Sequence, residues 1–223
     1  MNLKILIAVC VGAGLLCAES DAPKRLDAAA DSLKEVMGTP DKSIPQDLLA
    51  KAECIVIVPG LKKGAFIIGG KYGKGFLSCR KKEGVGWSAP GSIRVEGGSV
   101  GFQIGGTETD VFMLVMNQKG VDRLLSTKFT LGGDATVAAG PVGRSTQAET
   151  DAAMTAEILT WSRARGLFAG ISLSGATLRE DSDWNKELYG KKITNREIVT
   201  TAVAPPASAN SLMTELNRYS SRK

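Results

Sequence analysis

Cys54-Ile55-Val56-Ile57-Val58-Pro59-Gly60 opens the stretch that decides the fold, which continues to Gly106. Two glycine-bounded runs of the same kind follow it, Gly64-Ala65-Phe66-Ile67-Ile68-Gly69-Gly70 and Gly101-Phe102-Gln103-Ile104-Gly105-Gly106. Short runs of β-branched and aromatic residues between glycines and prolines are typical of consecutive strands joined by tight turns. We therefore expect this stretch to form the core of a sheet.

The spacing of apolar residues predicts where the strands lie. Between Ser99 and Gly105 the larger apolar residues alternate with small or polar ones, as in a strand with one buried face. Val111 to Met116 has no polar alternate, so we expect it to be buried on both faces. The segment Gly69 to Gly75 resembles a phosphate loop but lacks the P-loop pattern, and we interpret it as a hairpin turn that exposes Lys71 and Lys74. The predicted strands span residues 54–58, 64–69, 75–81, 92–95, 98–105 and 110–116.

Helices are predicted at both ends of this sheet. Apolar residues recur at three- and four-residue spacing from Lys24 to Met37, which indicates an amphipathic helix, and a short second helix precedes Ala52. Further predicted elements are a helix at 121–127, strands at 129–139, 153–165 and 166–175, and helices near 183–189, 195–200 and 208–219. A helix is the alternative for 153–165, and we favour a strand because 166–175 resembles its hairpin partner. Residues 21–223 therefore form one α+β domain, with a core at about 24–218 and a central antiparallel, barrel-like sheet between N- and C-terminal helices.

The first twenty residues have the features of a secretory signal peptide. Lys4 precedes an apolar run from Ile5 to Cys17, and Ala18-Glu19-Ser20 places small residues where a signal peptidase reads them. The run is shorter than the ~20 apolar residues that a membrane-spanning helix needs. We expect cleavage after Ser20 and export to the periplasm or the medium, with peripheral attachment to a membrane. The alternative is a lipoprotein that is lipidated at Cys17.

Export determines how the remaining cysteines are interpreted. If Cys10 and Cys17 leave with the signal peptide, Cys54 and Cys79 remain as an even pair in an oxidising compartment. We expect a disulfide between them, and two buried free thiols are the alternative.

The composition argues against most kinds of catalytic site. The chain has no histidine, which excludes Ser-His-Asp and Cys-His sites and the usual zinc sites. Glu108 with Asp110, and Glu180 with its acidic neighbours, lack the spacing of a calcium loop. The basic residues are not interleaved with aromatics, so no nucleic-acid partner is expected. We expect a protein that is not an enzyme and has no cofactor and no metal.

Several runs along the chain, read together, resemble the SYLF lipid-binding domain family. The runs cover most of residues 24–218 in order, and each run by itself is short. They are Ala52-Glu53-Cys54-Ile55-Val56-Ile57-Val58-Pro59, Lys63-Gly64-Ala65-Phe66, Trp87-Ser88-Ala89-Pro90, Gly98-Ser99-Val100-Gly101-Phe102-Gln103-Ile104-Gly105, Val115-Met116-Asn117, Leu131-Gly132-Gly133-Asp134-Ala135, Ala139-Gly140-Pro141-Val142-Gly143-Arg144, Ser162-Arg163-Ala164-Arg165-Gly166-Leu167-Phe168-Ala169-Gly170 and Leu188-Tyr189-Gly190.

This resemblance implies a non-catalytic domain that binds membrane lipids, with eukaryotic relatives that recognise phosphoinositides and regulate actin. The family's lipid contact is attributed to the N-terminal amphipathic helix, which implies Lys24, Arg25 and Lys34 here as residues that contact anionic headgroups. Lys62 and Lys63 are added from the sequence itself, because they lie at a predicted turn between strands. Three acids, Asp27, Asp31 and Glu35, balance the polar face of the helix, so the headgroup preference is left open.

The same apolar helix face cannot pack in the core and insert into lipid at once, and the sequence does not choose between these two arrangements. No actin partner is expected for an exported protein. Two other functions stay open: a structural or protein-interaction module of the envelope that self-associates through its strands, and a carrier of an apolar ligand inside the sheet.

Overall fold

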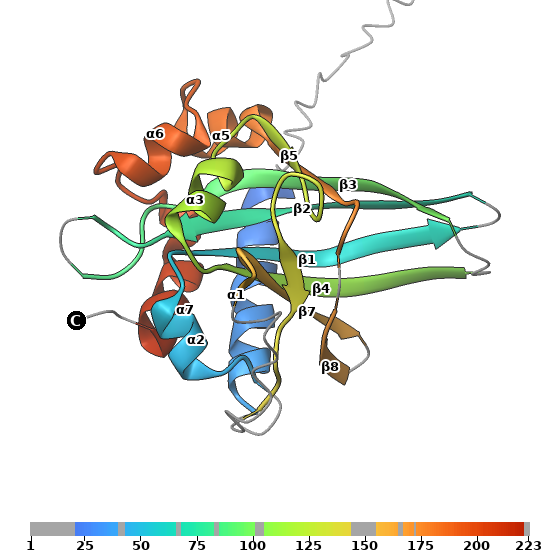
Figure 1. Cartoon of the computed structure of the whole chain (residues 1–223). Coiled ribbons are helices and arrows are strands. Elements are labelled where there is room, and N and C mark those ends of the chain that lie inside the picture. Colours follow the sequence, from blue (N-terminus) through green and yellow to red (C-terminus); the bar gives the residue numbers. More distant parts are fainter. Residues whose placement is uncertain are drawn as a thin grey trace, which may run out of the picture.

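A single large sheet with helices on both faces forms the molecule (Figure 1). The computed structural model describes residues 21–39, 43–65, 68–82, 85–100, 105–143, 155–164, 167–171 and 173–220. The predicted signal peptide at 1–20 lies outside these residues. The helices are α1 (Asp21–Met37), α2 (Gln46–Lys51), α3 (Gln118–Leu124), α5 (Ser182–Tyr189), α6 (Asn195–Thr200), the 3-10 helix η3 (Ala207–Ala209) and α7 (Asn210–Tyr219).

The sheet is mixed and curled, and the predicted α+β class is confirmed. Its strands are β1 (Cys54–Ala65), β2 (Ile68–Cys79), β3 (Gly91–Val100), β4 (Gly105–Val115), β5 (Lys128–Thr130), β6 (Val137–Ala139), β7 (Ile158–Ala164), β8 (Leu167–Gly170) and β9 (Thr177–Glu180). Their order is β5-β9-β3-β2-β1-β4-β7-β6, and β8 also pairs with β7. β6 and β7 run parallel, so the expectation of a purely antiparallel sheet is wrong at this edge.

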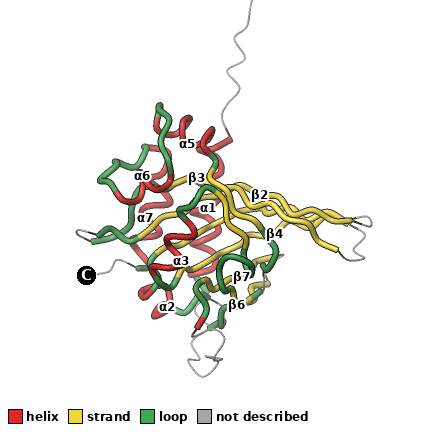
Figure 2. The backbone as a smooth tube through the Cα atoms, turned by 45° about the horizontal axis from the view of Figure 1, so that its top comes forward, coloured by secondary structure: helices red, strands yellow, loops and turns green. Residues whose placement is uncertain are grey.

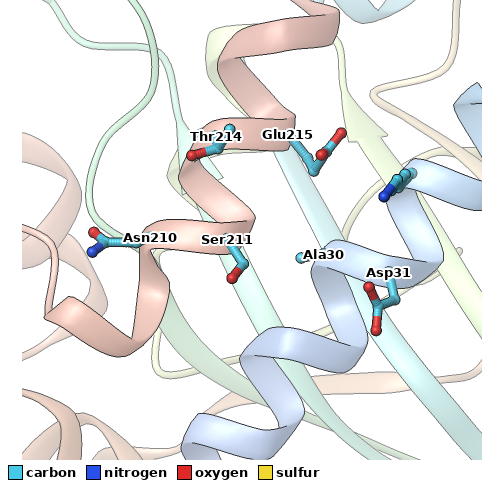
Figure 3. A pocket seen from close by; sticks show the side chains of 7 residues that line it. Ala30, Asp31, Asn210, Ser211, Thr214 and Glu215 are labelled. Carbon is cyan, nitrogen blue, oxygen red and sulfur yellow. The ribbon is translucent and has the colours of Figure 1, made fainter.

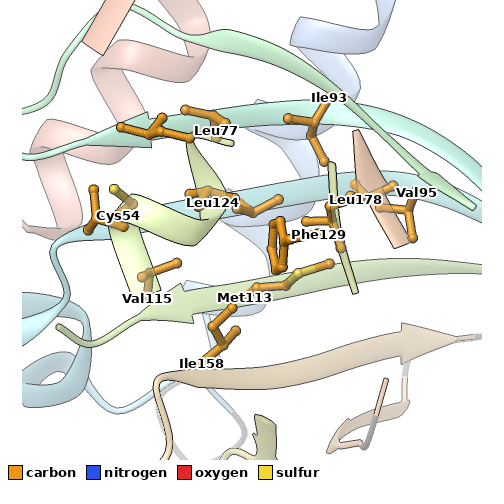
Figure 4. Close-up of a cluster of buried hydrophobic side chains, with 14 of the residues drawn as sticks. Cys54, Leu77, Ile93, Val95, Met113, Val115, Leu124, Phe129, Ile158 and Leu178 are labelled. Carbon is orange, nitrogen blue, oxygen red and sulfur yellow. The ribbon is translucent and has the colours of Figure 1, made fainter. Parts of the chain in front are cut away.

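The two faces of the sheet carry separate hydrophobic layers. On the face that we call the α1 face, Ile55, Ile57 and Phe76 pack against α1, α2, α5 and α7. On the opposite face, which we call the α3 face, Met113, Phe129 and Leu124 of α3 belong to one layer (Figure 4). Val56 of β1 and Ile198 of α6 belong to the same layer. The residues from Val111 to Val115 contribute to both layers and are all fully buried, as their unbroken apolar run predicts.

The first predicted strand continues beyond its predicted end. Pro59-Gly60 does not end β1, because it forms a bulge within the strand: Val58 pairs with Val111 and Leu61 pairs with Thr109, which leaves two residues opposite one. Gly60 adopts a φ of 59°, and its N–H donates a hydrogen bond to the Asp110 carboxylate. Because a bulge of this kind adds one residue, it reverses which side chains face α1 in the rest of the strand.

The predicted strands at 64–69 and 98–105 are wrong as single elements. Residues 64–65 end β1 and residues 68–69 begin β2, while 98–100 end β3 and Gly105 begins β4. Residues 101–104 lie outside the described part of the chain. The predicted turn at Gly69 to Gly75 is also wrong, because this segment is the first half of the continuous strand β2. The sheet therefore has four long central strands in place of six short ones.

Cys54 and Cys79 form a disulfide across β1 and β2, at directly paired positions 25 residues apart in the chain. We expect the double change Cys54→Ala and Cys79→Ala to lower the free energy of unfolding by about 3 kcal/mol, since the bond restricts the unfolded chain. Urea unfolding followed by tryptophan fluorescence measures this. Reductant should destabilise the parent chain by a similar amount and leave the variant unchanged. A loss below about 1 kcal/mol would contradict the prediction.

Candidate functional site

The four central strands extend beyond the rest of the sheet (Figures 1 and 2). β9 pairs with β3 only from Ile93 to Glu96, and β7 pairs with β4 only from Asp110 to Val115. Past these points β3, β2, β1 and β4 continue side by side without a further described strand at either edge. We call this part the sheet extension: residues 61–65 of β1, 68–73 of β2, 96–100 of β3 and 105–109 of β4.

Lys62 and Lys63 both lie in the sheet extension, on opposite faces. Lys62 pairs with Tyr72 of β2 and Glu108 of β4 on the α1 face. Lys63 pairs with Lys71 of β2 on the α3 face, since Leu61, two residues before it, belongs to the α3-face layer. The pKa of Lys63 is lowered by its partial burial and, to a smaller degree, by the charge of Lys71.

Arg25 connects the first half of α1 to the base of the sheet extension. Its guanidinium donates a hydrogen bond to the Pro59 carbonyl at the bulge, over a distance of 2.9 Å. A β-carbon on Gly60 would lie 2.5 Å from a Glu108 carboxylate oxygen and 3.2 Å from an Arg25 guanidinium nitrogen, so these two groups converge over the glycine. Arg25 is therefore held at the bulge, while its neighbour Lys24 is exposed.

Lys34 lies at the other end of α1, about 13 Å along the helix axis from Arg25. It borders a shallow groove between α1 and α7 with a volume of about 420 Å³ (Figure 3). The groove is lined by Ala30, Asp31, Lys34, Asn210, Ser211, Thr214 and Glu215. The five basic residues chosen from the sequence thus do not form one cluster: Arg25 reaches the base of the extension, and Lys34 faces a separate polar groove.

The apolar face of α1 belongs to the core. Leu26 and Leu33 are fully buried, and Val36 and Met37 are nearly so. Arg163 of β7 forms ion pairs with Glu35 of α1 and Asp110 of β4, which holds the second half of the helix against the sheet. Of the two arrangements left open by the sequence, the structure has the helix packed on the domain, where its apolar residues cannot touch lipid.

Lys71 is the basic residue that the sequence interpretation missed. It was assigned to an exposed turn, but it lies within β2 directly opposite Lys63. Lys74 was assigned to the same exposed turn, and this assignment is wrong as well. Its ammonium group forms a 2.8 Å ion pair with the buried Asp181 and stacks on the Trp184 ring. One face of the strand is made by every second residue, Lys71, Gly73, Gly75 and Leu77. This two-residue spacing is the signal that could have indicated a strand.

Within the described ranges, no group of three or more acidic or cysteine side chains is placed to hold a metal ion. Over the same part of the chain, no helix combines the length and the apolar character needed to cross a membrane. The sheet extension carries three lysines and two glutamates, and two of the lysines, Lys63 and Lys71, lie side by side on its α3 face.

Comparison with known proteins identifies the family. The family described as "Ysc84: Las17-binding protein actin regulator" matches residues 96–219, more than half of the chain. An SH3 domain-containing protein of Schizosaccharomyces pombe is 38% identical over 78% of this chain and 41% of its own length. The SH3 domain-containing YSC84-like protein 1 of Rattus norvegicus is 34% identical over 82% of this chain and 54% of its own length.

LAS seventeen-binding protein 3 of Saccharomyces cerevisiae is 35% identical over 77% of this chain and 38% of its own length. This chain thus spans about half or less of the length of these relatives. The matched region contains the second half of β3 and the strands from β4 to β9, together with α3 and the C-terminal helices. The match agrees with the resemblance seen in the sequence runs, and the chain belongs to the Ysc84 family of SYLF-type domains.

Proposed function

We propose that this chain is a non-catalytic protein that docks on anionic lipid surfaces through the sheet extension, with Lys24 at the start of α1 as a secondary contact. The observation that carries this proposal is the concentration of Lys62, Lys63 and Lys71 on a part of the sheet that projects from the body. Basic residues close to an anionic leaflet contribute about 1 kcal/mol each. Lys63 and Lys71 share the α3 face of the extension and can approach an anionic surface together, whereas Lys62 lies on the opposite face and contributes from its edge.

This proposal revises the docking mode expected from the family resemblance. Insertion of Leu26, Leu33, Val36 and Met37 would remove them from the core, where each is buried. In lipid these side chains would again be shielded from water, but the sheet residues that α1 covers, among them Ile55, Ile57 and Phe76, would be exposed. Full exposure of each such side chain costs about 1.5 to 3 kcal/mol, which is more than a few lysine contacts return. Docking through side chains that are already on the surface requires no such change.

Vesicle flotation with the full chain tests the proposal. We expect the double change Lys63→Ala and Lys71→Ala to weaken binding to vesicles of phosphatidylcholine with phosphatidylglycerol by about thirtyfold, which corresponds to the ~2 kcal/mol of two lysine contacts. The matched control changes Lys81 and Lys82 to Ala, since both are exposed and lie beyond the opposite end of β2. Binding should also fall as salt is raised.

Equal loss in the two double variants would show that only the total charge matters, and would refute the sheet extension as the docking surface. Retained binding in the first variant, combined with loss after changing Lys24, Arg25 and Lys34 to Glu, would instead support docking through α1.

A second candidate function is self-association through the free edges of the sheet extension. Residues 97–100 of β3 carry no charge, and within the described residues no strand pairs with their outer side. Such an edge can pair with a strand of another chain. Light scattering of the lipid-free protein distinguishes the candidates: a dimer that is disrupted by Ser99→Pro would support the second function. The carrier function is less well supported, because Phe129, Leu131 and Leu178 fill the space beside the α3 face.

A further inference from the structure

One row of side chains crosses the sheet extension on its α3 face. The pairings Gly97 with Lys71, Lys71 with Lys63, and Lys63 with Thr107 place these residues side by side on β3, β2, β1 and β4. Directly opposite residues of antiparallel strands have β-carbons about 5 Å apart. The ammonium groups of Lys63 and Lys71 can therefore reach the same small ligand, with the Thr107 hydroxyl beside them.

Among the described residues of the sheet extension, no acid balances the positive charge of this row on its own face. The next row toward the body contains Val95, Gly73, Leu61 and Thr109, and the next row outward contains Ser99, Gly69, Ala65 and Gly105. None of these register positions carries a charged residue. No ion pair of Lys63 or Lys71 is found among the described side chains.

The row on the opposite face has the reverse character. There the pairings place Lys62 between Tyr72 and Glu108, with Glu96 on the far side of Tyr72. Glu96 in turn forms ion pairs with Arg94 and Arg179, at 3.2 and 3.3 Å. Bases alternate with acids on the α1 face of the extension. The unbalanced pair on the α3 face is therefore specific to Lys63 and Lys71.

Two like charges on directly opposite residues destabilise a sheet. The pKa of Lys63 is lowered mainly by partial burial of the side chain and, to a smaller degree, by the charge of Lys71. A neutral residue at either position would therefore stabilise the fold at least as well as the lysine does. An arrangement of partly exposed side chains that costs stability in the free protein is typical of a binding site.

We propose that Lys63 and Lys71, assisted by the Thr107 hydroxyl, form a subsite for the phosphomonoester headgroup of a membrane lipid. A phosphomonoester carries a charge of about −1.5 to −2 near neutral pH and presents three acceptor oxygens. It can therefore neutralise both ammonium groups, whereas a phosphodiester has one charge and two free oxygens. Lysine binds phosphate as a point charge and needs no planar geometry.

The surroundings of the pair limit how such a group can enter. A β-carbon on Gly97 would lie 3.2 Å from the Ala176 α-carbon and 3.4 Å from the Gly175 carbonyl oxygen, so this loop borders the row on the β3 side. The buried Leu61 borders it toward the body. Both borders lie on the sides toward β9 and toward the body, and the pair itself lies on the part of the sheet that projects from the body. This favours a headgroup held in a surface over a phosphate free in solution.

The inference rests on the proposed lipid docking, and vesicle flotation with the full chain tests both. One vesicle type contains phosphatidic acid and the other phosphatidylglycerol, in phosphatidylcholine, with mole fractions adjusted to equal zeta potential. We expect tighter binding to phosphatidic acid and a loss of at least about tenfold there for Lys71→Thr. The matched control is Lys62→Thr, one residue from Lys63 on the other face, which should weaken binding to both vesicle types by a common factor of about five.

A second measurement separates binding from stability. The urea midpoint of Lys71→Thr should equal or exceed that of the parent chain, because the change removes a repulsive contact. A lower midpoint would show that Lys71 has a structural role and would overturn the inference.

The remaining outcomes distinguish the two proposals. Equal losses for Lys71→Thr and Lys62→Thr on both vesicle types would refute the subsite and leave general anionic docking in place. No binding of the parent chain to either vesicle type would refute the proposed function and the subsite together. If millimolar inorganic phosphate raises the urea midpoint and no preference for phosphatidic acid is seen, the site binds free phosphate, and its assignment to a lipid is wrong.

Discussion

Replacing Gly140 with alanine is expected to lower the free energy of unfolding by about 4 kcal/mol, near the upper limit for a single added methyl group. Gly140 follows β6 and lies against the ring of Trp161, which is fully buried. A β-carbon on Gly140 would be 2.0 Å from one ring carbon of Trp161 and 2.1 Å from another. Contacts of this length do not occur, so either the ring or the backbone must move.

Neither can move easily. The Trp161 indole donates a hydrogen bond to the Pro141 carbonyl, over 2.8 Å, which fixes the ring against the same segment. On the other side, Gly170 of β8 is so close that a β-carbon on it would lie 2.1 Å from the Gly140 carbonyl oxygen. The chain at Gly140 is thus confined between a buried ring and a neighbouring strand. Overpacking of a confined site is among the most destabilising single changes.

Urea unfolding and thermal unfolding measure this effect, and a loss of about 4 kcal/mol corresponds to a fall in Tm of roughly 10 °C for a chain of this size. Gly70→Ala is the matched control, because a β-carbon there meets nothing within 4 Å, and it should change stability by less than about 0.5 kcal/mol. Adding Trp161→Leu to Gly140→Ala should cost less than the sum of the two separate changes. Strict additivity would contradict the steric explanation.

The helices and the class of the fold could be predicted because their signals are local. The apolar period of α1 is continuous from Leu26 to Met37, and its buried residues are the ones that the period indicates. The helices α5, α6 and α7 also lie where they were predicted. In α1 the three- and four-residue spacing identifies the buried face. The buried faces of α5 and α6 also include Asn185 and Asn195, which apolar spacing does not indicate.

Strand boundaries in the sheet extension could not be predicted, because glycine there does not mark turns. Gly98, Gly70, Gly64 and Gly106 form one row across β3, β2, β1 and β4, a relation that depends on the register of the strands. Conversely, no glycine, proline, asparagine or aspartate stands between Ala65 and Ile68, where β1 gives way to β2. Sequence rules that place turns at glycine therefore divided the strands at the wrong residues.

The candidate site shows the same limit. Lys62 and Lys63 were chosen because they are adjacent in the sequence, yet the alternation of a strand places them on opposite faces. Lys71 is eight positions from Lys63 and becomes its partner only through the pairing of β1 with β2. A cluster that forms across strands is determined by register, and the register here is shifted by the bulge at Gly60.

Replacing Arg80 with methionine is the second change expected to have a large effect, again about 4 kcal/mol. Arg80 follows β2 at the end of the sheet opposite the extension, and it is buried. Its guanidinium donates hydrogen bonds to the carbonyls of Leu49, Ala52 and Ser220, and it stacks on the Trp87 ring at 3.7 Å. These carbonyls lie at the C-terminal ends of α2 and α7.

The position explains why the guanidinium is needed there. The last carbonyls of a helix have no partner within the helix and carry a partial negative charge, so a cation with several donors stabilises them. Here one guanidinium donates hydrogen bonds to the C-terminal carbonyls of both α2 and α7. The Trp87 indole donates further hydrogen bonds to the carbonyls of Leu216 and Ser220. Methionine fills a similar length but donates nothing, which removes the guanidinium donors from the carbonyls of Leu49, Ala52 and Ser220. Trp87 still donates to the Ser220 carbonyl. Lysine retains the charge but lacks the planar set of N–H donors of arginine. Arg80→Lys should therefore lower the free energy of unfolding by less than Arg80→Met does.

Urea unfolding of Arg80→Met, Arg80→Lys and the control Arg196→Met tests this interpretation, since Arg196 is exposed on α6 and its change should cost less than about 0.5 kcal/mol. Native-state hydrogen exchange adds a local test: in Arg80→Lys, amides in the last turn of α7 should lose more protection than those of α5. If Arg80→Lys is as destabilised as Arg80→Met, the charge contributes little and the directed hydrogen bonds account for the effect. A loss below about 1 kcal/mol in Arg80→Met would instead show that water replaces the guanidinium at these helix ends, and the proposed role of Arg80 would be wrong.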